Sequence, residues 1–272
     1  MTLTFTILGC GSSGGVPRLG GEDGAGFWGA CDPLNPKNRR RRCSLLVTRR
    51  GPQGETHVLV DTSPDMRDQL LDARVGTLDG VLITHDHADQ LHGLDDLRMV
   101  AMNIRRRVGL YADATTFEGV LSRFGYCFVQ PAGSDYPPIL NAVQIGEPFA
   151  AFAIEGKGGP IEVLAFHQGH GRIRSLGFRF GGLAYSSDVD ALDDAALAAL
   201  SGVECWIVDA LRYTPHSSHS HVARTLEWIA RVKPRRAILT NLHVDLDYAK
   251  LAAELPSGVE PAFDGMTVEL AE

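Results

Sequence analysis

The chain has 272 residues, 44% of them hydrophobic and 22% charged, which is typical of a soluble globular protein long enough to bury a core. Its formal net charge of −7 argues against a surface that coats nucleic acid. We expect no membrane span and no secretion signal. The five scattered cysteines predict reduced thiols and a cytoplasmic location.

The first predicted element is a strand over Leu3–Leu8, where threonine alternates with apolar residues. It leads into a glycine-rich segment, Gly9–Pro17, whose glycines permit positive φ angles and a close approach of the backbone to a ligand. The segment lacks the Lys-Ser/Thr of a Walker loop and does not match the dinucleotide fingerprint. A structural turn and a loop that contacts a ligand are both compatible with it.

A basic segment follows, with Lys37 and four consecutive arginines just before a strand predicted over Cys43–Val47. Such a segment is either a solvated face or a phosphate clamp, because a guanidinium can pair with phosphate in a bidentate way. We therefore include four weak candidates for substrate binding: Arg39, Arg40, Arg41 and Arg42.

A strand over His57–Val60 ends at Asp61, and a helix is predicted from Asp65 to Ala73. The next strand, Val81–Thr84, is β-branched and aliphatic, which indicates burial. Metal-type ligands follow it directly, at the carboxyl end of the strand, where open α/β sheets place their sites: His85, His87 and Asp89. Imidazole and carboxylate suit zinc, manganese or iron(II), and two histidines that flank one residue can chelate one ion.

Helical spacing predicts helices over residues 94–105 and 115–124, with a strand over 108–111 between them. The segment Tyr126–Pro138 mixes aromatic residues with Gly and Pro, and it is compatible with a lid or a dimer contact. In the second half of the chain, a helix is predicted over Val222–Val232. Each strand predicted there is followed by polar side chains. His167 and His170 follow the strand over 161–166, and Asp188 follows the hairpin over 176–186. Asp209 follows the strand over 205–208, and Asn241 and His243 follow the strand over 237–240.

The His-x-His-x-Asp pattern after a strand resembles the signature of the metallo-β-lactamase fold superfamily. The glycine-rich opening and the segment from Leu239 to Tyr248 are similar to its cyclic phosphodiesterase branch, which includes phosphoribosyl 1,2-cyclic phosphate phosphodiesterases and is related to ribonuclease Z. This resemblance implies an α/β fold, a four-layer αββα sandwich, formed by one hydrolase domain over residues 1–272. It also implies the metal ligands His85, His87, Asp89, His170 and Asp188. Asp61 is expected to support the site without binding the metal itself.

Two positions depart from the family pattern, because Gln90 and Asn241 stand where the family has histidines of its second metal. An amide oxygen is a weaker ligand than imidazole for zinc-like ions. One metal ion, zinc or manganese, is therefore expected to bind firmly. A second ion remains possible if Asp89 and Asp188 keep it with help from Gln90, Asn241, His92 or His243.

The resemblance also implies a proton donor at the start of the helix over Val222–Val232, where His219 fits best and His216 and His221 are alternatives. The expected function is a metal-dependent phosphodiesterase that cleaves a small phosphate diester, such as a cyclic one, with a metal-bound hydroxide oriented by Asp89 or Asp188. The alternatives are a transfer-RNA 3′-processing nuclease, a non-catalytic metal-binding accessory protein, and a thioester or lactone hydrolase. A homodimer is expected only by resemblance.

Overall fold

The structure is a computed structural model that describes residues 2–147 and 149–271. Its contacts divide the chain into two compact units. Unit 1 consists of the residues up to Thr6, Ser44–Val163 and the residues from Thr267 onward, and unit 2 consists of Ile7–Cys43 and Leu164–Met266. The prediction of one hydrolase domain over 1–272 is not tested by this division and stays a prediction.

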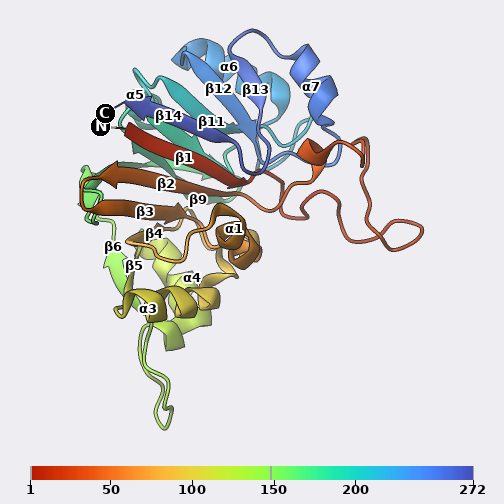
Figure 1. The fold of residues 1–272 in the computed structure, drawn as a ribbon. Helices are drawn as coiled ribbons and strands as arrows, with labels where there is room; N and C mark the ends of the chain where they lie inside the picture. Colours follow the sequence, from red (N-terminus) through yellow and green to blue (C-terminus); the bar gives the residue numbers. More distant parts are fainter. Residues whose placement is uncertain (1, 148, 272) are drawn as a thin grey trace. The chain divides into compact units, whose positions relative to one another are not determined.

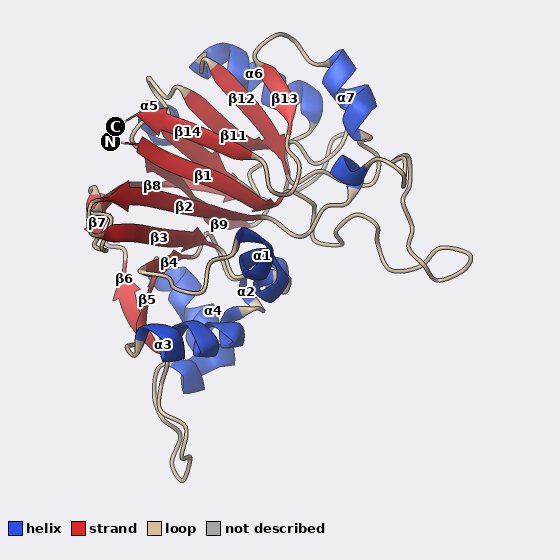
Figure 2. Ribbon diagram, viewed as in Figure 1, coloured by secondary structure: helices blue, strands red, loops and turns tan. Residues whose placement is uncertain are grey.

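The sheet of unit 1 has the strand order β14-β1-β2-β3-β4-β5-β6 within the described residues (Figure 1). Strands β3, β4, β5 and β6 run parallel to one another. The strands are β1 (Thr2–Gly9), β2 (Ser44–Gly51), β3 (Gly54–Val60), β4 (Gly80–Leu82), β5 (Val108–Ala112), β6 (Leu140–Gln144) and β14 (Thr267–Ala271). The helices of this unit are α1 (Met66–Ala73), α2 (Ala88–Leu91), α3 (Leu97–Ile104) and α4 (Ala114–Phe124), and Figure 2 shows α3 and α4 near β5.

The second sheet has the order β13-β12-β11-β10-β9-β8-β7. Strands β10, β11, β12 and β13 run parallel, whereas β8, β9 and β10 pair antiparallel. The strands are β7 (Phe152–Ile154), β8 (Ile161–His170), β9 (Ile173–Phe180), β10 (Leu183–Ser186), β11 (Cys205–Asp209), β12 (Arg236–Thr240) and β13 (Val259–Pro261). The helices of unit 2 are α5 (Asp194–Ala199), α6 (Val222–Val232) and α7 (Tyr248–Glu254).

The apolar side chains of unit 2 explain why its helices pack on its sheet. A buried cluster joins Trp206 and Val208 of β11 with Ala196 of α5 and Val222 of α6. The indole Nε1 of Trp206 donates a hydrogen bond to Ser186 Oγ at 3.0 Å, so its one polar atom is satisfied within the core. Burying one face of α6 in this way fixes the loop that precedes it, which carries His219.

The predicted α/β class and most central elements are confirmed, and α6 has the predicted bounds. Strand β8 is longer than predicted and runs on to His170, so this histidine ends a strand rather than following one. The segment Tyr126–Pro138 forms a short 3₁₀ turn (Gly125–Cys127) and then an irregular loop with an exposed Tyr136. Its role as lid or dimer contact stays a prediction.

All five cysteines lie in the described chain as free, buried thiols. Burial is the leading cause that raises the pKa of each of them, to about 11 for Cys127 and for Cys205. The helices formed by residues 2–147 and 149–271 are all too short or too polar to cross a bilayer.

Asp264 of unit 2 generates a prediction about stability and pH. Its carboxylate accepts hydrogen bonds from the backbone N–H groups of Arg41 (2.7 Å) and Cys10 (3.1 Å), but burial raises its pKa from 3.8 to about 6. Because the folded state then holds this proton more tightly than the unfolded state, the free energy of unfolding should fall as pH rises from 4 to 6. The rise in the pKa of Asp264 from 3.8 to about 6 corresponds to a loss of about 3 kcal/mol in the free energy of unfolding across this pH range.

The measurement is denaturant unfolding of the wild type and Asp264→Asn at several pH values between 4 and 7. The variant should lack this part of the pH slope, whatever its absolute stability. Equal slopes for the two proteins would contradict the raised pKa.

Candidate metal centre and catalytic residues

In unit 1, the candidate residues follow the carboxyl ends of the parallel strands β3 and β4. Asp61 follows β3, and its backbone N–H donates to Leu82 O at 2.8 Å. The chain leaving β4 continues as Ile83, Thr84 and His85. The ladder between the two strands therefore extends one residue further and sets Asp61 beside Thr84.

Asp61, Thr84 and His85 form a buried chain of hydrogen bonds. The backbone N–H of Thr84 donates to Asp61 Oδ1 at 2.8 Å, and its hydroxyl lies 3.0 Å from each Asp61 oxygen and 3.0 Å from His85 Nδ1. Because an ionised carboxylate only accepts, the hydroxyl donates to Asp61 and accepts from His85 Nδ1–H. This arrangement selects the tautomer with a lone pair on Nε2, as a metal-binding imidazole needs.

His87 lies at the start of α2 and is exposed. Its ring packs edge-on against that of His85, with centroids 4.5 Å apart and one ring nitrogen of each within 4.8 Å of the other. Arg123 of α4 clamps the residue between them, because it donates to Asp86 O at 2.7 Å and forms an ion pair with the Asp86 carboxylate. The loop therefore holds both imidazoles at a spacing that suits chelation of one ion.

Asp89 does not lie on the same loop as His85 and His87, because helix α2 begins at Ala88. It lies on a helical turn, and Nε2 of the buried Gln90 donates to Asp89 Oδ2 at 3.3 Å. Where the family has a histidine, this chain thus has an amide that orients the neighbouring carboxylate.

Unit 2 builds its candidate site in the same way. The parallel strands β10, β11 and β12 lead at their carboxyl ends to Asp188, Asp209 and Asn241. His170 ends β8 and His219 lies in the loop before α6. These five residues, here called the unit 2 cluster, are buried except for the partly buried His219.

Three members of the unit 2 cluster can hold a metal ion. Ligand atoms of His170, Asp188 and His219 lie within 4.8 Å of one another. His170 Nδ1 lies 2.6 Å from Ser218 O, and because a carbonyl only accepts, the proton is on Nδ1. The lone pair of His170 is then on Nε2, which lies 4.0 Å from Asp188 Oδ1. This donor set of buried imidazole and carboxylate fits a divalent cation such as zinc.

His219 is also paired with a buried acid. Its Nδ1 lies 2.9 Å from Asp209 Oδ2 and 3.7 Å from Asp188 Oδ1. Burial is the main cause that raises the pKa of Asp209, whereas hydrogen bonds from His219 and Asn241 oppose the rise. The Nδ1–H of His219 therefore donates to Asp209, and Nε2 is the nitrogen available for proton exchange.

Asp61, Asp188 and Asn241 share a left-handed backbone conformation, with φ angles of 63°, 52° and 61°. Asp61 and Asn241 directly follow the strands β3 and β12, and Asp188 is the second residue after β10. Aspartate and asparagine are the residues, after glycine, that best tolerate this region. Such conformations are costly and persist where the surroundings enforce them, which is common at functional sites.

The other candidates from the sequence lie in different settings. His216 is near His219, with ring centroids 5.1 Å apart, and His221 is at the N-cap of α6. His243 Nδ1 lies 3.0 Å from Asp245 Oδ2. His92 is exposed, and its ring packs edge-on against Phe124.

The four arginines differ in environment. Arg40 is buried, and its guanidinium is committed to a loop of unit 2 through bonds to Leu246 O (2.8 Å), Asn38 Oδ1 (3.1 Å) and His243 O (3.3 Å). Arg39 lies over the ring of Trp28, and Arg41 lies 3.7 Å from Asp264. A role in substrate binding stays a prediction for Arg39, Arg40, Arg41 and Arg42.

Sequence reasoning gave no role to Asp209 and Thr84, although both were visible at strand ends. The signal for Asp209 was its place at the end of a strand in the same run as Asp188. Its pairing with His219, ten residues later, depends on the path of the intervening loop.

The chain from Asp61 to His85 yields a test of metal binding. Thr84→Val removes the hydroxyl but keeps the shape of the side chain, so the orientation of His85 loses its support. We expect affinity for zinc, measured by competition with a chromophoric chelator, to fall roughly ten- to hundredfold. Thr84→Ser, which keeps the hydroxyl, is the matched control. Unchanged affinity in Thr84→Val would contradict this role.

Comparisons with known proteins agree with this architecture. The family model of the β-lactamase superfamily domain matches residues 56–241. A crystal structure of a new diphosphatase from the PhnP family is 30% identical, with a TM-score of 0.85 over 99% of this chain and 98% of that one. The Zn²⁺-bound PqqB from Methylobacterium extorquens is 17% identical, with a TM-score of 0.69 over 98% of this chain and 100% of that one, and it shows the shared fold.

Two curated relatives also match. The Octanoyltransferase of Porphyromonas gingivalis is 28% identical over 98% of this chain, and the Coenzyme PQQ synthesis protein B of Xanthomonas euvesicatoria is 27% identical over 57% of it. The chain spans about half the length of these curated relatives, 51% and 53%. The resemblance drawn from the sequence is confirmed: the chain belongs to the metallo-β-lactamase superfamily and, within it, to the PhnP family.

Proposed function

We propose that the protein hydrolyses a P–O bond in a small molecule, either the ester bond of a cyclic phosphodiester or the anhydride bond of a diphosphate, with the help of a divalent metal ion. The observation that carries this proposal is the Asp209–His219 pair beside His170 and Asp188. It combines a candidate proton donor with candidate metal ligands in one cluster. The PhnP-family diphosphatase supports a phosphate substrate by analogy.

The candidate ligands fit a divalent metal by their chemistry. His170 and His85 each have a hydrogen bond on Nδ1 that leaves the lone pair on Nε2. By the family resemblance, we assign His85, His87 and Asp89 of unit 1 and His170 and Asp188 of unit 2 as metal ligands. Gln90 and Asn241 are the candidates for further ligands. A bound divalent ion would polarise the phosphoryl oxygen and lower the pKa of a coordinated water.

In this proposal, His219 is the proton donor to the leaving-group oxygen. Asp209 accepts its Nδ1–H and stabilises the protonated ring, which can then pass the Nε2 proton to the oxygen. Asn241 Nδ2 lies 3.1 Å from His219 Nδ1, so the amide contacts the ring of the proposed donor. Asp89, oriented by Gln90, is a second acid that can direct the attacking water.

One observation favours a second candidate function, the hydrolysis of an acyl thioester. The relative that matches 98% of this chain is named for octanoyl transfer, although the chain covers only 51% of that protein. The same fold hosts many chemistries, so the site rather than the fold must decide between acyl carbon and phosphorus.

The first test combines metal content with a substrate panel. Elemental analysis of protein purified without chelator should give at least one zinc or manganese per chain. Turnover is then measured on bis(p-nitrophenyl) phosphate, a ribose cyclic phosphate, a nucleoside diphosphate and octanoyl thioester. We expect cleavage of at least one phosphate substrate and slower cleavage of the thioester. Metal binding without turnover of any substrate would favour the accessory-protein alternative, and absence of metal binding would overturn the proposal.

The second test concerns the proton donor. Asp209→Asn removes the negative charge that stabilises the protonated His219, so kcat should fall roughly 10²- to 10⁴-fold for a substrate with a poor leaving group. The alkaline limb of the pH–rate profile should move to lower pH. Asp194→Asn, on the surface of α5, is the control.

Metal content must be measured in the same Asp209→Asn sample. Retained metal with reduced kcat agrees with proton donation. Loss of metal together with activity would instead make His219 a ligand, and unchanged kcat would leave His219 without the proposed role.

A further inference from the structure

The glycine-rich segment, Gly9–Pro17, contains none of the candidate metal ligands. In unit 2 it forms a tight turn, in which Gly15 N–H donates to Ser12 O at 2.7 Å. Gly11 bridges to Leu242, and Ser12 N–H contacts Leu242 O at 3.4 Å. The turn therefore lies directly beside the segment that follows β12.

Two polar atoms at this turn have no hydrogen-bond partner among the described residues. They are the hydroxyl oxygen of Ser12, a residue that is only 3% exposed, and Nε of Arg18. Arg18 lies against the turn, because a Cβ placed on Gly14 would be 3.0 Å from Arg18 Nε. Buried polar groups normally find partners, so two such groups at one turn indicate a ligand that supplies them.

Further positive charge gathers beside the turn. His243 N–H donates to Leu211 O at 2.9 Å, which sets His243 next to Arg212. His243 also follows Leu242, the residue that bridges to Gly11, so the turn and Arg212 both lie close to this histidine. The acid that faces them is Asp245, which contacts His243 Nδ1, and the Arg212 guanidinium donates to the carbonyls of Thr214 and Pro215.

We propose that Ser12, Arg18 and His243 form a phosphate-binding subsite, with Arg212 adding positive charge at its side. The subsite takes a phosphate group of the substrate other than the one that is attacked. A hydroxyl, a guanidinium and an imidazole donor match the oxygens of a phosphate, and the guanidinium supplies charge. The reacting group belongs to the unit 2 cluster, whose Asn241 lies two residues before His243 on the chain. The proposal rests on the proposed function for its substrate class and narrows that class to molecules with two phosphate groups.

Direct binding is the first test. Inorganic phosphate is titrated into the protein as purified, by isothermal calorimetry, for the wild type and four variants. Arg18→Gln and Ser12→Ala should weaken binding at least tenfold. Gly14→Ala should also weaken it, because the added Cβ displaces Arg18 without removing its charge. Arg231→Gln, an exposed arginine on α6, should bind like the wild type. Wild-type affinity in both Arg18→Gln and Ser12→Ala would overturn the subsite.

Kinetics separates this proposal from the proposed function. Arg18→Gln should raise KM for a nucleoside diphosphate roughly tenfold or more and leave kcat/KM for bis(p-nitrophenyl) phosphate unchanged, because the latter has no second phosphate. Equal losses on both substrates would overturn the subsite. If neither substrate is cleaved by the wild type, the proposed function fails, and the calorimetric comparison still decides whether the subsite exists. A molten or unfolded variant is recognised by its thermal unfolding curve and is replaced by Arg18→Lys.

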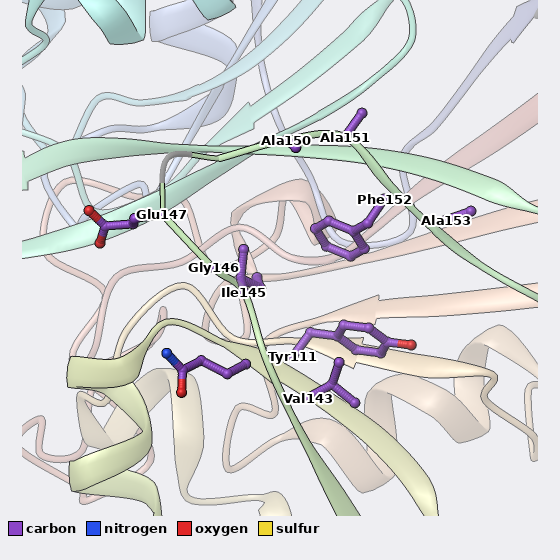
Figure 3. A pocket seen from close by; sticks show the side chains of 10 residues that line it. Tyr111, Val143, Ile145, Gly146, Glu147, Ala150, Ala151, Phe152 and Ala153 are labelled. Atoms are coloured by element: carbon purple, nitrogen blue, oxygen red, sulfur yellow. The ribbon is translucent and has the colours of Figure 1, made fainter.

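Unit 1 has a separate pocket, and its lining does not support phosphate binding. The pocket lies beside the stacked rings of Tyr111 and Phe152, and its remaining lining is mostly aliphatic or small (Figure 3). Its one charged side chain is Glu147, which would repel a phosphate.

Discussion

A carboxylate buried beneath an imidazole is the interaction on which both candidate sites depend. Burial disfavours the charged form of Asp61 and Asp209, so each needs donors close by. Asp61 receives two from Thr84, and Asp209 receives one from His219 and another from the backbone of Val189. Satisfying the acid at the same time sets the tautomer of a histidine. The hydrogen bonds that stabilise the buried charge therefore also fix the position of a lone pair or a proton on the histidine ring.

Much of the fold follows from local sequence. The central strands are continuous β-branched and aliphatic runs, and α6 has a clear helical period, so both could be predicted. The edge strand β6 could not, because four of its five residues are exposed and lack a pattern. Strand β7 has only three residues. The alternation in β14 and the Asp247 cap of α7 were readable, and these elements were simply not predicted.

The candidate site was predictable where ligands are adjacent in sequence, as with His85 and His87. The partners of these ligands were harder to identify, because Asp61 and Thr84 are 23 residues apart and their contact depends on strand pairing. The left-handed conformations of Asp188 and Asn241 had no sequence signal beyond their residue types. The unpartnered Ser12 is a property of the packed turn, which composition alone does not reveal.

The five buried thiols have a practical consequence for experiments on this chain. Because only the thiolate reacts readily with alkylating reagents, thiols that are buried and hard to ionise stay inert at neutral pH. A cysteine introduced at an exposed position, such as Arg231 on α6, would then be the one fast-reacting site on a background that needs no cysteine removal. The natural chain is in effect already prepared for site-specific attachment of a fluorophore or spin label.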